Sequence, residues 1–166
     1  KILFDLLKGN KDFLAKLNLK VLIAPHDLSK KHLAVLKTTF PKAQFYSQWN
    51  EPNSLGSSIL ILDTIGHLSA AYQYGSVAFI GGGFSGSLHN ILEPLAYGLP
   101  VLFGPKYEKF PEAQQFIDLG FAQVIADAQG LDQILLSLME NQKDAKAIIE
   151  AQVFNLQGKI GSKLVS

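Results

Sequence analysis

The strongest chemical signal lies in the segment from Gly81 to Pro94, which reads Gly-Gly-Gly-Phe-Ser-Gly-Ser-Leu-His-Asn-Ile-Leu-Glu-Pro. An apolar run precedes it, and a helical pattern is expected to begin near His89. Glycines such as Gly82 and Gly83 let a backbone approach a ligand closely, and the N–H groups of a helix N-terminus attract phosphate. Ser85 would add a hydroxyl donor. The segment therefore predicts a phosphate-binding loop.

Two polar side chains follow the glycines. Asn90 and Glu93 are three residues apart, so on a helix they would share one face of the first turn and reach the same ribose. The alternative is structural, with Asn90 capping the helix and Glu93 complementing its dipole. His89 and Glu93 have a spacing that suits a metal, but a cap and a ribose ligand explain them without one. We expect no metal site.

Two shorter segments also follow apolar runs. In Ala24–Asp27, His26 would donate to a phosphate or a base, although a surface turn that opens a helix explains the same residues. In Asp63–Leu68, Gly66 would let a base or ribose contact the backbone, whereas an acid or hydroxyl at the start of this segment would simply cap a helix. Each segment, taken alone, leaves both interpretations open.

A dinucleotide fingerprint is also present. Gly81, Gly83 and Gly86 match G-x-G-x-x-G after a strand and before a helix. That pattern expects an acidic residue at the end of the next strand, where this chain has Leu102–Pro105. It also belongs to the first strand-to-helix turn, and this turn is the fourth. A sugar nucleotide is therefore favoured over NAD(P), and no cofactor is expected.

Short apolar runs alternate with helical patterns along the chain. Continuously apolar strands are typical of a parallel sheet buried on both faces, and the alternation implies right-handed crossovers. The sequence predicts an α/β fold, a three-layer Rossmann-like domain with a mostly parallel sheet of about six strands. The expected strands are 20–24, 43–46, 59–62, 77–80, 101–103 and 122–125, and the expected helices lie near 3–17, 29–39, 66–74, 89–97, 109–119, 130–140 and 143–157.

The composition of the chain excludes several classes of function. The 166 residues, 48% of them hydrophobic, fit a single domain over 1–166. The net charge is +1 and arginine is absent, so no nucleic-acid partner is expected. Without cysteine, disulfides and thiolate catalysis are excluded. An opening without Met, already amphipathic, indicates a piece of a longer protein, and no apolar run approaches the roughly 18–20 residues that span a bilayer.

The order of these motifs resembles the 3-deoxy-D-manno-octulosonic acid (Kdo) transferases, which are GT-B glycosyltransferases of lipopolysaccharide synthesis in Gram-negative bacteria. The resemblance covers roughly Val21–Met139, and its most specific part is the His-Asn-x-x-Glu block after the glycine loop. The motifs that carry it are Ile-Ala-Pro-His-Asp, Asp-Thr-Ile-Gly-His-Leu, Ala-Phe-Ile-Gly-Gly-Gly-Phe, His-Asn-Ile-Leu-Glu-Pro and Gly-Leu-Pro-Val-Leu-Phe-Gly-Pro.

The resemblance implies the C-terminal half of a GT-B fold, which binds the CMP-Kdo donor. An N-terminal domain would hold the lipid A precursor and the catalytic base, so no catalytic residue is expected here. The parent protein would lie at the cytoplasmic face of the inner membrane, and the fragment would be soluble. Together, the resemblance and the glycine loop predict CMP contacts at Pro25, His26, Ile65, Gly66, His67, Gly82, Gly83, Ser85, Asn90, Ile91, Leu92 and Glu93.

Two positions depart from the family pattern. Many members have Pro-Arg where this chain has Pro25 and His26, and many have glutamate where His67 stands. A backbone contact is therefore expected at His67. Two other functions remain open at this point: a donor-binding domain of a UDP- or GDP-sugar transferase or epimerase, and a non-catalytic nucleotide-binding module.

Overall fold

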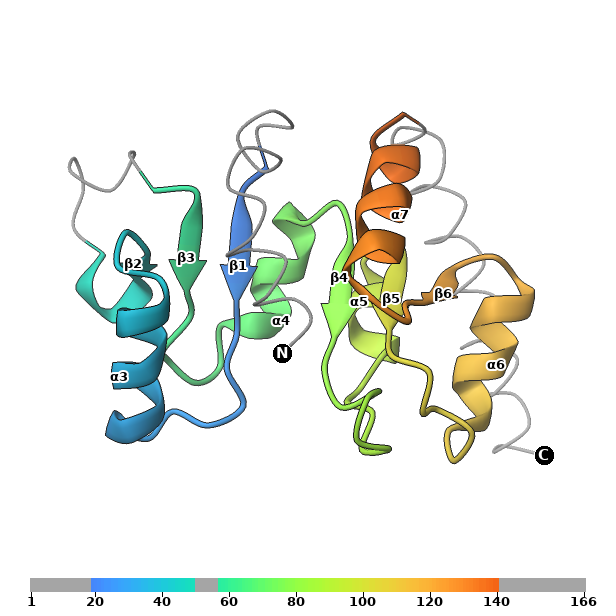
Figure 1. Ribbon diagram of the computed structural model, residues 1–166, viewed down its shortest axis with the longest axis horizontal. Coiled ribbons are helices and arrows are strands. Elements are labelled where there is room, and N and C mark those ends of the chain that lie inside the picture. The colour runs from blue at the N-terminus through green and yellow to red at the C-terminus, as the bar shows by residue number, and fades with distance from the viewer. Residues whose placement is uncertain (1–18, 50–56, 141–166) are drawn as a thin grey trace, which may run out of the picture. The chain divides into compact units, whose positions relative to one another are not determined.

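The computed structural model describes residues 19–49 and 57–140, and its elements alternate between strands and helices (Figure 1). All six expected strands are present, each within its predicted range. The helices expected near 3–17 and 143–157 lie outside the described residues. The strands are β1 (Val21–Ile23), β2 (Gln44–Phe45), β3 (Ile59–Ile61), β4 (Ala78–Ile80), β5 (Val101–Phe103) and β6 (Ala122–Val124).

The helices are short, and most match the predicted ranges. The expected helix at 66–74 is divided into an α-helix and a 3-10 turn, and the one at 89–97 begins only at Leu92. No helix of residues 19–49 and 57–140 has the length and apolarity to cross a bilayer. The helices are α3 (Lys30–Thr39), α4 (Leu68–Ala71), α5 (Leu92–Ala96), α6 (Pro111–Asp118) and α7 (Ala128–Glu140), with 3-10 turns η1 (Tyr46–Gln48) and η3 (Tyr72–Tyr74).

The chain divides into two compact units, and the boundary lies between Ala70 and Ala71. In the first unit the strand order is β1-β3-β2, and both pairs are parallel. Ile23 and Ile61, which pair across the ladder, are buried, and so is Leu36 of α3. In the described part of this unit, these apolar side chains of β1, β3 and α3 are therefore shielded from water.

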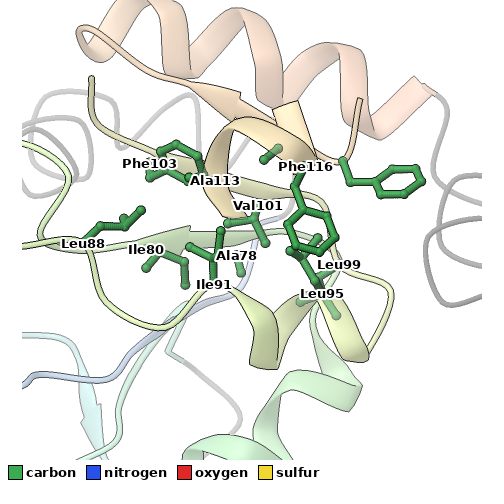
Figure 2. Packing of buried hydrophobic residues seen from close by; sticks show 12 residues of the cluster. Ala78, Ile80, Leu88, Ile91, Leu95, Leu99, Val101, Phe103, Ala113 and Phe116 are labelled. Atoms are coloured by element: carbon green, nitrogen blue, oxygen red, sulfur yellow. The ribbon is translucent and has the colours of Figure 1, made fainter. Parts of the chain in front are cut away.

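In the second unit the order is β4-β5-β6, again with parallel pairs. The central strand β5 is buried along its whole length. Figure 2 shows Ile80 of β4 beside Leu88 and Ile91, and Leu95 of α5 close to Leu99. The segment that follows β4 thus returns to the core of its own sheet before α5 begins.

The strand ladders differ from the expected single sheet of about six strands. Hydrogen bonds join the strands into two sheets of three. The alternation of strands and helices predicts parallel pairing and the number of strands, both of which are found. The alternation does not reveal how many strands join one sheet, because that depends on the hydrogen bonds between strands. The expectation of one nucleotide-sugar-binding domain over 1–166 stays a prediction.

Two leucines of α5 test this packing. Leu95 is fully buried, whereas Leu92, one turn away, is 44% exposed. Leu95→Ala should lower the free energy of unfolding by about 2–5 kcal/mol, because it removes buried apolar surface and leaves a cavity. Leu92→Ala should lower it by about 1 kcal/mol or less. Urea unfolding of both variants measures the difference, and equal losses would contradict the assigned faces of α5.

Candidate functional site

The glycine segment forms a loop that folds back on itself directly after β4. Gly82 has a φ of +86°. Its carbonyl accepts hydrogen bonds from the N–H groups of Ser85 and Ser87, both at 3.0 Å, and the Gly81 carbonyl accepts one from the N–H of His89 at 3.1 Å. The backbone of the loop is therefore fixed by its own hydrogen bonds.

Packing within the protein requires glycine at positions 82 and 83. A Cβ added at Gly82 would overlap the carbonyl of Ser87, and one added at Gly83 would lie 2.6 Å from the amide nitrogen of Gly104. From the sequence, these glycines are expected to permit the close approach of a ligand. The structure gives them a further cause, which is the tight turn itself and its contact with the next loop. Gly86, by contrast, faces open space.

The loop after β5 lies against the glycine loop. In Figure 1 both loops lie at the arrowhead ends of their strands. The N–H of Lys106 donates to the Gly83 carbonyl at 2.7 Å. The ring of Tyr107 packs 5.5 Å from that of Phe103, and its hydroxyl donates to Gln114 of α6 at 3.1 Å. No motif in the sequence marks Lys106 or Tyr107, although Gly104-Pro105 after an apolar strand indicates a turn at this edge.

Asn90 and Glu93 do not share a helical face, which corrects the expectation. The side-chain carbonyl of Asn90 accepts a hydrogen bond from the N–H of Leu92 at 3.0 Å, so Asn90 precedes α5. Helix α5 has only five residues, and a helix this short has a small dipole. His89 also precedes it, so the spacing of His89 and Glu93 is not helical. In residues 19–49 and 57–140, no three His, Asp or Glu side chains gather closely enough to hold a metal ion.

Glu93 is half-buried in the first turn of α5, and the neighbouring Ile91 is buried. Burial raises the pKa of Tyr72, and the negative charge of Glu93 raises the same pKa further. Ser85, also predicted as a ligand donor, uses its hydroxyl to bond the Gly82 carbonyl at 3.0 Å.

In the first unit, the predicted residues lie at one edge of the sheet. Pro25 and His26 follow β1, the Ile65–His67 turn follows β3, and the two strands are parallel neighbours. Pro25 is half-buried and His26 is exposed. The N–H of Ser29 donates to the Asp27 carboxylate at 2.8 Å, which lowers the pKa of Asp27.

The Ile65–His67 turn is held by contacts that sequence analysis missed. The Asp63 carboxylate accepts hydrogen bonds from the backbone N–H and the hydroxyl of Ser47, and so does not act as a helix cap. Thr64 and His67 are joined by a hydrogen bond of 3.0 Å, and the His67 ring lies 5.1 Å from that of Tyr46. Ile65 is 88% exposed. The turn is therefore exposed to solvent at Ile65, while the contacts of Thr64 and His67 hold it in place.

The contact between the two glycine-containing loops can be tested with a matched pair of substitutions. Neither Gly81 nor Gly83 has a positive φ, so alanine strains neither backbone. At Gly81 the nearest atom to an added Cβ is 3.7 Å away, whereas at Gly83 it is the Gly104 amide nitrogen at 2.6 Å. Gly83→Ala should cost about 1–3 kcal/mol of stability, and Gly81→Ala about 0.5 kcal/mol or less. Urea unfolding provides the measurement, and a neutral Gly83→Ala would show that the two loops do not touch.

The chain is similar in sequence to proteins named 3-deoxy-D-manno-octulosonic acid transferase. It is 28% identical over 138 residues to the one from Chlamydophila psittaci, a match covering 80% of this chain and 31% of the relative. For Chlamydia muridarum the match is 30% over 141 residues, covering 81% and 32%. For Haemophilus influenzae it is 29% over 146 residues, covering 85% and 34%. The chain thus spans about a third of the length of these curated relatives.

The fold is that of a solved structure, the C-terminal CMP-Kdo binding domain of WaaA from Acinetobacter baumannii. The TM-score is 0.74 at 22% identity, and the match covers 92% of this chain and 81% of that one. This confirms the α/β fold class. No family model matches the chain. The sequence matches confirm the family that the motifs indicated. Over most of its length, this chain is a homologue of the 3-deoxy-D-manno-octulosonic acid transferases.

Proposed function

We propose that this chain is the donor-binding part of a Kdo transferase with a GT-B fold. It would bind CMP-Kdo, and the whole enzyme would transfer Kdo to a lipid A precursor at the cytoplasmic face of the inner membrane. The names of the sequence relatives and of the structural neighbour support this proposal. Because the chain matches about a third of each relative, the acceptor site and the catalytic base would lie in the rest of the enzyme.

The observation that carries the proposal is the fixed glycine loop at the carboxyl end of β4. In α/β folds, ligands bind beyond the carboxyl ends of the parallel strands. The turn over Gly82–Ser87 is held by its own hydrogen bonds before any ligand binds, so little conformational entropy would be lost on binding. We place the CMP phosphate at this turn, where the donors would be backbone N–H groups other than those of Ser85 and Ser87, which bond the Gly82 carbonyl.

The ribose would lie next to the start of α5. Glu93 is the acidic residue of its first turn and is half-buried, so a ribose hydroxyl could donate to a carboxylate that is partly shielded from water. Asn90 would contribute through its side-chain amide, while its carbonyl stays on Leu92. In the first unit, Pro25, His26 and the Ile65–His67 turn stay predictions of CMP contact.

The division between donor and acceptor parts predicts the behaviour of the isolated chain. It should bind CMP more tightly than UMP, UDP or GDP, and it should transfer no Kdo to a lipid A precursor. Calorimetric titration with the four nucleotides and a transfer assay measure the two properties. Preference for UDP or GDP would indicate another sugar-nucleotide enzyme, and Kdo transfer by this chain alone would contradict the proposed division.

Substitution of Glu93 tests its contact with the ribose. A charge-assisted hydrogen bond contributes roughly 1.5–3 kcal/mol and a neutral one roughly 0.5–1.5 kcal/mol, so Glu93→Gln, whose amide oxygen can still accept, should weaken CMP binding roughly 5- to 12-fold. Glu112 is the matched control, because it is also half-buried and is the acidic residue in the first turn of α6. Glu112→Gln should leave CMP affinity unchanged. Equal CMP affinities of folded Glu93→Gln and wild type would remove Glu93 from the site.

A further inference from the structure

A phosphate at the glycine loop calls for a positive partner, and the chain has few candidates. It contains no arginine, and its fifteen basic residues are all lysines. Within the described part of the second unit, residues 71–140, lysine occurs only at Lys106 and Lys109. Both are exposed and belong to the loop between β5 and α6. Any lysine that neutralises the phosphate from this part of the unit must therefore come from that loop.

The backbone of Lys106 is anchored directly to the glycine loop. Its N–H donates to the Gly83 carbonyl at 2.7 Å, and the close approach of Gly83 to Gly104 brings the two loops together just before it. On its other side, Tyr107 is held by Phe103 and Gln114. The backbone of Lys106 is therefore fixed beside the proposed phosphate position, and only its flexible methylene chain has to move for the ammonium to reach the phosphate.

Lys109 lacks this anchor. It lies three residues further along, and among the hydrogen bonds of residues 71–140 none joins it to the glycine loop. The acidic Glu108 stands beside it. Of the two lysines, Lys106 is thus the one that the geometry favours.

We propose that Lys106 binds the donor: its ammonium pairs with the phosphate of a nucleotide held at the glycine loop. This inference rests on the proposed function and adds to it a cationic residue that none of the motifs identified. In a chain without arginine, the lysine would act as a single mobile charge on the phosphate, in contrast to the two-pronged contact that a guanidinium makes.

The test is calorimetric titration of the full chain with CMP, using variants of Lys106. Lys106→Gln should weaken CMP binding roughly 5- to 20-fold, between the effect of an exposed ion pair and that of a charge-assisted hydrogen bond at a partly buried site. The CMP affinity of wild type should fall as salt is raised, and that of Lys106→Gln should fall less steeply. Lys106→Arg should keep most of the affinity. Thermal melts should show all three proteins equally stable.

Lys109→Gln is the matched control, with the same change of charge on the same loop. It should leave both CMP affinity and its salt dependence close to those of wild type. The inference is overturned if folded Lys106→Gln binds CMP like wild type, or if Lys109→Gln weakens binding as much. A wild-type chain that binds no CMP would instead refute the proposed function, so the two failures are distinguishable.

Discussion

The close contact between Gly83 and Gly104 is the constraint on which the proposed phosphate site depends. Both residues are buried, and a Cβ on either would lie within 2.7 Å of the other's backbone. Because neither carries a side chain, the loops after β4 and β5 can touch through their main chains, and the Lys106 N–H reaches the Gly83 carbonyl. Two loops from neighbouring strands thereby become one fixed surface at the carboxyl edge of the sheet.

The hydrophobic core of the second unit supports the two loops. Strand β5 is buried along its length, and Leu88 and Ile91, which follow the glycines, are buried in the same core. The glycine loop is thus held in three ways: it continues from β4, its last residues pack in the core, and its Gly83 carbonyl bonds the loop that follows β5. A site held in this way can offer backbone donors to an anion with little rearrangement, which is what binding a nucleotide phosphate requires.

Much of the fold could be predicted from the sequence, because buried parallel strands are continuously apolar and stand out between helical patterns. The start of α5 could not, because the Asn90 side chain accepts a hydrogen bond from the Leu92 N–H just ahead of the helix, a local contact that periodicity does not reveal. The bonds from Ser47 to Asp63 and from Lys106 to Gly83 join residues far apart in the chain, and no motif marks them. The glycines were recognised as important, but the contact between loops that requires them becomes visible only in three dimensions.

In the proposed complex, CMP binds at the joined loops after β4 and β5. The most direct measurement is a titration of the isotopically labelled chain with CMP, followed through the chemical shifts of its backbone amides. Within the second unit, the largest changes should fall on the amides of Gly82–Ser87, Glu93 and Lys106. Saturating CMP that left these amides unmoved, while others shifted, would contradict this placement of CMP.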